Sequence, residues 1–300
     1  MKFKHFISLS VFGLKTVIFK KKNPIVGSII ITDRCNLNCK HCSVSNINTI
    51  MYSYEQIKQD MSTLYHMGVR ILFFYGGEPF LWHHSNKNLR DLVIEAKQMG
   101  FYLVNVVTNG TYHLDLPEAD LIMVSVDGDR DIHNLIRGNV FDDILKNVKN
   151  STSNNICFYM AINKLNQHTI ENVVNLAVDT NNVKCVSFNF HTPYPDTKEL
   201  ALSIDEKRRC LAVISHLIKS KKPILNLKST FKYIENNNFK TPCYQSVLIE
   251  NGKIYTCGRC IEITGLCQEC GYFYAAEYSL LFQGKIKVIF DFLKTYSKIM

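Results

Sequence analysis

Three cysteines stand close together near the start of the chain, with the spacing C-x3-C-x2-C of Cys35, Cys39 and Cys42. The apolar run 26–32 just before them predicts a strand, which places the cysteines in the loop that follows it. Three thiolates on one short loop can converge on one metal centre. A structural zinc site usually has four protein ligands, whereas a four-iron cluster held by three cysteines keeps one iron open to an outside ligand.

Polar residues also follow the later predicted strands. Gly76-Gly77-Glu78-Pro79 comes after the run 70–75, and there the glycines would let backbone approach a ligand closely, with a carboxylate beside it. The other candidates at or after strand ends are Asn109, Ser125, Asp127, Arg137, Asn163 and His191. Because the functional residues of α/β folds gather where parallel strands end, we expect these side chains to face one mouth. Their alternative roles are local caps and, for the arginine, a solvated surface position.

The elements that must position these residues alternate along the chain. Strand-like runs occur at 26–32, 70–75, 102–108, 121–126, 156–162 and 184–190, and helical patterns at 54–68, 86–99, 139–149, 168–179 and 204–219. A further amphipathic helical pattern occurs at 285–297. Ser53, with Gln56 three residues later, predicts the start of the first of these helices. The alternation predicts an α/β fold with a parallel sheet. Six units are too few for a closed eight-fold barrel, so we expect a partial (β/α)6 TIM-like barrel or a doubly wound sheet.

A second group of cysteines follows residue 235, where the alternation ends; it comprises Cys243, Cys257, Cys260, Cys267 and Cys270. Between the first two, the segment VLIENGKIYTC predicts a hairpin that turns at Asn251-Gly252. The two C-x2-C pairs fit either an iron–sulfur cluster or a zinc site. The remaining three thiols, Cys157, Cys185 and Cys210, lie in strand or helix patterns and are expected to be buried in the core.

The first cysteine motif, with His41 at its usually aromatic position, resembles the signature of the radical S-adenosylmethionine superfamily. The GGEP segment 76–79 and the string Ser125-x-Asp127-Gly…His133-x3-Arg137-Gly resemble further motifs of that superfamily, and the resemblance covers about residues 26–192. It implies a 4Fe-4S cluster on Cys35, Cys39 and Cys42, whose open iron chelates S-adenosylmethionine. One-electron reduction then cleaves the sulfonium to a 5′-deoxyadenosyl radical, which abstracts a hydrogen atom from an unactivated carbon.

The same resemblance assigns cofactor contacts. It implies that Gly76, Gly77, Glu78 and Pro79 meet the methionine amino group, and that Ser125 contacts the ribose or the carboxylate. Arg137 would pair with that carboxylate, and Asn163 and His191 would lie near the adenine and the substrate. The full set of expected cofactor-binding residues is His41, Gly76, Gly77, Glu78, Pro79, Asn109, Ser125, Asp127, Arg137, Asn163 and His191.

The second cysteine group resembles the SPASM and twitch extensions of the superfamily, which hold auxiliary iron–sulfur clusters. Its first spacing, C-x8-G-x4-C, is one residue shorter than usual, and a full SPASM domain has more cysteines. We therefore expect one auxiliary 4Fe-4S cluster, with zinc as the alternative. The expected domains are an N-terminal segment (1–24), a radical SAM core (25–235) and an auxiliary-cluster region (236–300).

These features predict an enzyme that modifies a peptide or a small molecule and receives electrons from a protein such as flavodoxin or ferredoxin. An alternative is an enzyme acting on a membrane lipid or isoprenoid. A third reading is a non-catalytic metal-binding or electron-transfer protein, although electron transfer alone needs no methionine pocket.

The amino-acid composition further narrows the class of protein. The chain has 300 residues, of which 46% are hydrophobic and 20% charged, as in a globular protein. Eleven cysteines with no recognisable secretory signal favour metal chemistry in the cytoplasm. Six of the nine net positive charges come from lysines in residues 1–22, so no dispersed nucleic-acid surface is expected. That segment predicts a basic amphipathic helix, which either contacts a membrane peripherally or packs on the barrel bottom.

Overall fold

The computed structural model describes residues 11–13, 15–19, 23–42, 46–241 and 243–297. One eight-stranded sheet runs through these residues in the order β10-β9-β1-β2-β5-β6-β7-β8. Its strands are β1 (Val26–Thr32), β2 (Ile71–Gly76), β5 (Leu103–Thr108), β6 (Leu121–Ser125), β7 (Ile156–Ile162), β8 (Val183–Phe190), β9 (Ser246–Glu250) and β10 (Lys253–Thr256). A separate small hairpin pairs β3 (His83–His84) with β4 (Lys87–Asn88).

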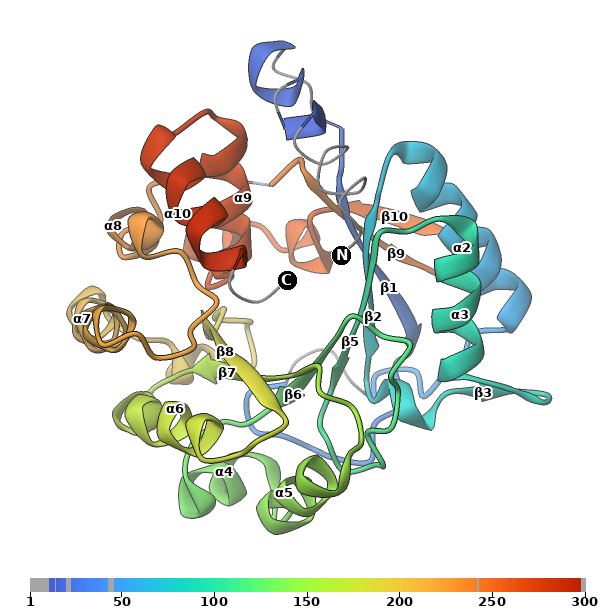
Figure 1. The fold of residues 1–300 in the computed structure, drawn as a ribbon, viewed down its shortest axis with the longest axis horizontal. Coiled ribbons are helices and arrows are strands. Elements are labelled where there is room, and N and C mark those ends of the chain that lie inside the picture. The colour runs from blue at the N-terminus through green and yellow to red at the C-terminus, as the bar shows by residue number, and fades with distance from the viewer. Residues whose placement is uncertain (1–10, 14, 20–22, 43–45, 242, 298–300) are drawn as a thin grey trace.

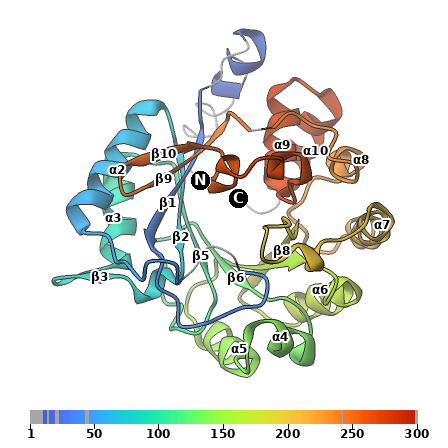
Figure 2. The same ribbon diagram turned by 180° about the vertical axis from the view of Figure 1, so that it is seen from behind.

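The sheet curves into an arc whose outer side is covered by helices (Figures 1 and 2). These are α2 (Tyr54–Met67), α3 (Leu89–Met99), α4 (Arg130–Arg137), α5 (Phe141–Asn150), α6 (Ile170–Val178) and α7 (Ile204–Lys219). The short α8 (Phe231–Ile234), α9 (Phe273–Phe282) and α10 (Ile286–Tyr296) stand at the open side of the arc in Figure 1. The predicted partial (β/α)6 barrel is thus confirmed, and the doubly wound alternative is wrong because helices do not cover both faces.

Successive side chains along each strand point alternately into the core under the helices and into the barrel interior. On β2, Leu72 and Phe74 are fully buried in the main core, together with residues of the outer helices. The intervening Phe73 and Tyr75 face the other way and line an internal cavity. The same pattern repeats on β6, where Ile122 is in the core and Met123 lines the cavity. Since strand residues point alternately to opposite faces, the apolar layer under the helices fixes which residues enter the barrel.

Two local features predicted from the sequence are present, the N-terminal cap of α2 and the turn of the C-terminal hairpin. Ser53 Oγ accepts a hydrogen bond from the Gln56 backbone N–H at 3.2 Å, which caps the helix. In the hairpin β9–β10, Asn251 and Gly252 both adopt positive φ, 48° and 78°, as a two-residue turn of this kind requires. Because β9 pairs in parallel with β1, the cysteine-rich region shares the main sheet.

The sequence patterns do not predict three of the helices, α4, the short α8 and α9. The sequence of α4 is short and mostly polar; its start is capped by Asp129 Oδ1, which accepts from the Ile132 N–H at 3.3 Å. The sequence of α9, FYAAEYSLLF, is apolar on nearly all sides and so lacks a helical period. The predicted helix at 285–297 is present as α10.

The N-terminal segment is described only in part. Residues 11–13 and 15–19 are helical, and the rest of the predicted amphipathic helix, 1–10, 14 and 20–22, lies outside the described residues. Phe12 meets Phe282 of α9 edge to face, with ring centroids 5.7 Å apart, and Thr16 is buried. Within the described ranges, no helix is long and apolar enough to span a bilayer.

One buried carboxyl group joins α9 to the chain before α8. Glu277 Oε1 accepts a hydrogen bond from the Leu227 backbone N–H at 2.9 Å. Burial raises the pKa of Glu277 to about 7, and the negative charge of Asp291 on α10 adds to the rise, while the hydrogen bonds from Leu227 and Asn226 oppose it. The folded chain therefore holds a proton here that the unfolded chain releases at lower pH.

We expect Glu277→Gln to reduce the loss of stability that the wild type shows as pH rises. Between its ordinary pKa of 4.5 and its folded pKa of about 7, the folded state binds the proton more tightly, so unfolding becomes easier with increasing pH. Between these two pKa values, the proton on Glu277 accounts for a fall of about 3 kcal/mol in the free energy of unfolding. Denaturant unfolding at about pH 5 and pH 8 measures it. The exposed Glu171→Gln on α6 is the control, and an equal pH dependence in both variants would contradict the prediction.

Candidate functional site

The loop that carries Cys35, Cys39 and Cys42 follows β1 and is fixed by the chain beyond it. The buried Asp33 accepts hydrogen bonds from the backbone N–H groups of Ile50, at 2.6 Å, and Asn48, at 2.5 Å. The Cys35 N–H donates to Asn46 Oδ1 at 2.7 Å. The cysteine loop is therefore closed against residues 46–50, which holds it over the end of the sheet.

Gly76 and Gly77, at the end of β2, allow this loop to approach. A Cβ at Gly76 would lie 1.9 Å from the Thr32 carbonyl oxygen, and one at Gly77 would lie 2.0 Å from that of Arg34. The Gly77 N–H donates to Thr32 O at 2.8 Å, and the Glu78 N–H donates to Arg34 O at 2.8 Å. The close approach that requires glycine here is thus between the GGEP segment and the backbone leading into the cysteine loop.

Glu78 ties this segment to the end of β5. One carboxylate oxygen accepts from Thr108 Oγ1 at 2.7 Å, and the other accepts from the Asn109 N–H at 2.7 Å. The first oxygen also caps the short turn that begins at Pro79, accepting from the Phe80 N–H at 3.1 Å. Burial raises the pKa of Glu78 to about 6, against the opposing effect of these hydrogen bonds.

Two sulfur atoms of the first motif receive hydrogen bonds from neighbouring side chains. Asn109 Nδ2 lies 3.7 Å from Cys35 Sγ and also donates to Asn36 Oδ1 at 2.8 Å. Arg137 Nη1 lies 3.7 Å from Cys39 Sγ. Donors directed at sulfur favour its thiolate or metal-bound form, so both residues support a metal centre at this loop.

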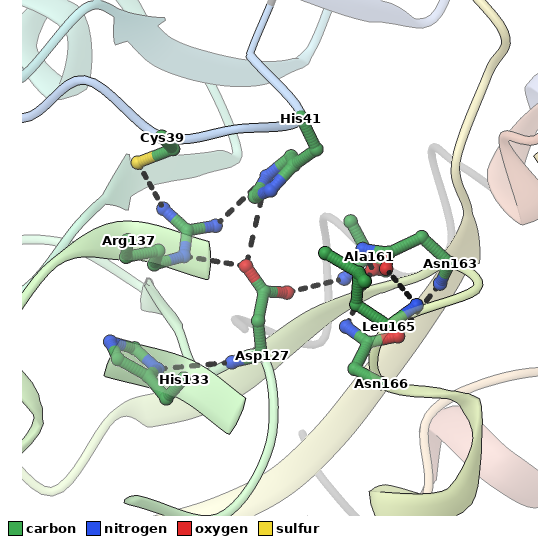
Figure 3. A network of polar contacts seen from close by, with 9 residues as sticks. All are labelled: Cys39, His41, Asp127, His133, Arg137, Ala161, Asn163, Leu165 and Asn166. Carbon is green, nitrogen blue, oxygen red and sulfur yellow. Dashed lines mark hydrogen bonds and ion pairs between the residues drawn. The ribbon is translucent and has the colours of Figure 1, made fainter. Parts of the chain in front are cut away.

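Arg137 is the centre of a buried polar network (Figure 3). Its Nε donates to Asp127 Oδ2 at 2.5 Å, and its Nη2 lies 3.4 Å from His41 Nε2. Asp127 in turn accepts from the Ala161 N–H at 3.0 Å. The network therefore joins the cysteine loop, the end of α4, the end of β6 and strand β7 around one guanidinium group.

The charges in this network follow from burial and proximity. Burial alone would lower the pKa of Arg137 and raise that of Asp127, but each holds the other in its charged form. Burial raises the pKa of Cys39 to about 11, although the guanidinium opposes the rise. Metal binding at Cys39 must therefore displace a proton.

His41 is neutral in this setting. Burial lowers its pKa to about 4, and the charge of Arg137 adds to burial while Asp127 opposes it. The 3.7 Å approach of His41 Nε2 to Asp127 is therefore no salt bridge. Because a guanidinium only donates, Nε2 accepts and Nδ1 carries the proton. Among the described residues, this buried Nδ1 has no hydrogen-bond partner, which leaves a donor for a bound ligand.

The remaining predicted residues differ in placement. Asn163 shapes the turn after β7: its Oδ1 accepts from the Leu165 N–H at 2.8 Å and its Nδ2 donates to Ala161 O at 3.2 Å (Figure 3). His191 Nε2 lies 3.0 Å from Thr197 Oγ1, and its ring stands edge-on to that of His41, with centroids 6.4 Å apart. Ser125 ends β6 and is almost buried.

A cavity of about 1100 Å³ opens from this site into the barrel. Of the predicted residues it is lined by His41, Cys42, Arg137 and His191 from the first group and by Cys257 and Cys260 from the second. The GGEP segment, Asn109, Asp127 and Asn163 stand behind the wall and position it. Sequence reasoning missed several wall residues, namely Tyr75, Tyr159, Asn189, Tyr194, Arg259 and Tyr272. The alternation of inward and outward residues along the strands could have identified Tyr75, Tyr159 and Asn189 as facing the cavity. Nothing in the sequence singles out Arg259.

The five cysteines of the second group border one small hollow beside the main cavity. Cys243 and Cys270 are buried, and burial raises the pKa of Cys243 to about 12. Cys257 Sγ lies 3.8 Å from the Tyr274 hydroxyl. All five are free thiols, and within the described ranges no set of three or more metal-binding side chains is arranged to hold a single ion.

Gly77→Ala should destabilise the metal-free chain by about 1–3 kcal/mol, because the new methyl group would overlap the Arg34 carbonyl oxygen and push the cysteine loop away. Gly13→Ala is the matched control, since its Cβ would meet only Phe282, at 3.8 Å. Urea unfolding of both variants measures the effect. Equal stabilities would show that the loop has room to move.

Comparison with known proteins places the chain in a family. The radical SAM superfamily matches residues 29–177. Fe-coproporphyrin III synthase of Methanosarcina barkeri is 29% identical over 215 residues, which cover 65% of this chain and 51% of the relative. The sporulation killing factor maturation protein SkfB of Bacillus subtilis is 30% identical over 165 residues, which cover 50% of this chain and 39% of the relative. The chain thus spans about half or less of these relatives.

Among solved structures, Streptococcus suis SuiB bound to S-adenosylmethionine superposes with a TM-score of 0.65 and 14% identity, covering 96% of this chain and 74% of SuiB. SuiB bound to its precursor peptide SuiA gives a TM-score of 0.63 and 15% identity, covering 94% and 72%. At these identities the likeness concerns the fold. Together with the three-cysteine loop, the GGEP segment and the partial barrel, the matches show that the chain belongs to the radical S-adenosylmethionine superfamily, in its form with a cysteine-rich C-terminal extension.

Proposed function

We propose that this protein binds a 4Fe-4S cluster and S-adenosylmethionine at the cysteine loop and abstracts a hydrogen atom from an unactivated carbon of a peptide or small molecule in the barrel. The observation that carries the proposal is the position of the loop: it lies where β1 ends, and both Cys42 and His41 reach the wall of the large cavity. A radical formed there would meet a substrate bound inside the barrel.

The residues present fit the two groups. Three thiols lie on one loop, and the Cys35 and Cys39 sulfurs already receive donors from Asn109 and Arg137. The unpartnered Nδ1 of His41 offers a further donor at the cavity wall. The charged Arg137 suits the carboxylate of a methionine moiety, because charge-assisted pairs of this kind are strong.

When bound, the cluster and S-adenosylmethionine supply the chemistry: one electron splits the sulfonium into methionine and a 5′-deoxyadenosyl radical, which takes a hydrogen atom and leaves a substrate radical. The chain orients the reactants and keeps water from them. The buried pair of Asp127 and Arg137 fixes the wall at the reacting end, and the enclosing barrel shields the radical from solvent. The electron would come from a protein such as flavodoxin or ferredoxin.

The substrate classes rest on the relatives. SkfB is named as a maturation protein for a sporulation killing factor, and SuiB has been solved with a precursor peptide. These support a peptide substrate, while the name of Fe-coproporphyrin III synthase supports a small molecule. Usual ligand pockets measure roughly 300–1000 Å³, so the cavity of about 1100 Å³ could hold the cofactor together with part of either substrate.

For the C-terminal cysteines we propose a second 4Fe-4S cluster, with zinc as the alternative metal. The grouping of all five around one hollow supports a shared metal centre. Cys257 and Cys260 also face the main cavity, so a cluster that they helped to hold would supply one-electron redox chemistry beside a bound substrate. We retain the division into an N-terminal segment (1–24), a core (25–235) and an auxiliary region (236–300) as part of this proposal.

Anaerobic reconstitution should load about seven to eight irons per chain, as two four-iron clusters require. Replacing Cys35, Cys39 and Cys42 with alanine should remove about half of that iron and leave the rest, because the second group lies in a separate hollow. Iron and zinc analysis of both proteins decides between the metals. About four irons with tightly bound zinc in the wild type would overturn the second cluster.

With dithionite and S-adenosylmethionine, the reconstituted protein should produce 5′-deoxyadenosine. Cys39→Ala should abolish this product because the cluster loses a ligand, whereas Cys210→Ala, a buried thiol of α7 that packs in the main core, should retain it. Chromatographic detection of 5′-deoxyadenosine is the measurement. Unchanged production by Cys39→Ala would contradict the enzymatic proposal, and its absence from all three proteins would favour a non-catalytic metal protein.

A further inference from the structure

The cavity does not end at the reacting site but continues along the whole barrel. On β2 its wall includes Tyr75 near the strand end, then Phe73, then Ile71 at the strand start. Four residues of strand span about 13 Å. The interior of a closed eight-stranded barrel is normally filled by layers of side chains, whereas this open arc encloses a hollow that runs along the strands.

The half of the cavity away from the cysteine loop is here called the lower chamber. It is lined by Phe73, Met123, Leu225, Tyr278, Phe292 and Tyr296. These side chains come from the middle of β2 and β6, from the chain after α7 and from α9 and α10. The proposed cofactor contacts lie at the other end, so the lower chamber has no assigned ligand.

The six side chains that define the lower chamber are apolar or aromatic, and polar residues near the strand starts, among them Asn105, Asn155 and Lys184, also line the cavity. Asn226 donates to Phe188 O and accepts from the Phe188 N–H, at 3.1 and 2.7 Å, so its amide is used within the fold. Glu277 accepts from the Leu227 N–H, as described above. Against the apolar part of this wall, a peptide backbone would lose hydrogen bonds to water at a free-energy cost, whereas an apolar chain would gain from burial.

The chamber opens to the surface beside α10. Leu293 both lines the cavity and is 41% exposed, which marks the opening. Ile286, Phe290 and Leu293 form one exposed stripe at helical spacing, the first two each 67% exposed. Ile18 and Phe19 of the N-terminal segment are exposed as well. We call these five residues the apolar rim.

The two parts of the apolar rim belong to neighbouring segments. The side chain of Val17 lies against Gly284, in the turn between α9 and α10, and Val17, Phe282 and Leu293 line the same cavity. Lysines accompany both parts: Lys15 is exposed on one segment, and Lys285, Lys287 and Lys294 lie on or next to α10. Exposed apolar side chains among lysines are typical of elements that bind anionic lipid surfaces.

We propose that the lower chamber binds the apolar chain of an amphiphilic substrate, which enters past the apolar rim from an anionic lipid surface and presents its polar end to the S-adenosylmethionine site. The proposal rests on the proposed function and narrows its substrate to a molecule with a long hydrocarbon chain. The apolar wall holds the chain, and the length of the barrel sets which carbon reaches the reacting end.

Binding of cis-parinaric acid, a fatty acid that fluoresces in apolar sites, tests the chamber. Met123→Trp and Leu225→Trp each place a large side chain in the empty space, and each should weaken binding by at least about tenfold. Val213→Trp, at an exposed position of α7, is the control and should bind like the wild type. Two independent filling variants, each checked by thermal unfolding, keep the test valid if one fails to fold. Unchanged binding in the folded variants would overturn the assignment.

The same reconstituted variants separate this inference from the proposed function. Both filling variants should still form 5′-deoxyadenosine without substrate, because neither residue is placed at the cofactor end. Formation of 5′-deoxyadenosine with no probe binding by the wild type would overturn the lower chamber and leave the proposed function standing. Probe binding with no 5′-deoxyadenosine would instead remove the proposed function, and with it the claim that the bound chain is a substrate.

Vesicle flotation tests the source of the substrate. The full chain should float with phosphatidylglycerol-containing vesicles at low salt and not with phosphatidylcholine vesicles. Ile286→Ser combined with Phe290→Ser should abolish flotation while leaving cis-parinaric acid binding in solution intact, since neither residue lines the chamber. A wild type that binds the probe but never floats would overturn entry from a lipid surface.

Discussion

The buried ion pair between Asp127 and Arg137 is the interaction on which the geometry of the site depends. It takes one partner from the end of β6 and the other from the end of α4, and through Arg137 it reaches the cysteine loop at Cys39 and His41. Removing either partner of such a pair leaves an uncompensated buried charge, which costs far more than a surface ion pair contributes. The pair therefore adds a buried, charged contact at Cys39 and His41 to the backbone hydrogen bonds that already hold the loop.

The same pair acts together with burial on the protonation of the groups around it. Burial is the main cause of the low pKa of His41 and of the raised pKa of Cys39. The guanidinium adds to the first effect and opposes the second, and its hydrogen bond to His41 fixes which imidazole nitrogen carries a proton. A glutamine or lysine at position 137 would not reproduce this, since only a guanidinium can donate in one plane to a carboxylate, a sulfur and an imidazole together.

Much of the fold could be predicted because its signals are local. The six apolar runs became the six parallel core strands, and the cap at Ser53 and the turn at Asn251-Gly252 are present. What could not be predicted depends on contacts distant in sequence. The GGEP glycines leave space for the backbone of residues 32–34, which lies some forty residues earlier in the chain. The helix α9 forms although its apolar sequence has no helical period. The sequence predicts which residues are candidates for cofactor contacts but not which of them face the cavity. Asn163 shapes its own turn, whereas His41 lines the cavity.

The open arc of strands connects these observations. Six βα units cannot close on themselves, so the gap between β8 and the hairpin β9–β10 is filled by the C-terminal helices (Figure 1). Helices pack against the arc through aromatic side chains such as Phe273, which meets Phe190 of β8 at a centroid distance of 4.9 Å. Other aromatic side chains of this region, Tyr274, Tyr278 and Phe282, line the cavity instead. An incomplete barrel closed by α9 and α10 thus places cysteines and tyrosines of the C-terminal region along the cavity wall, from Cys257 and Cys260 to Tyr296.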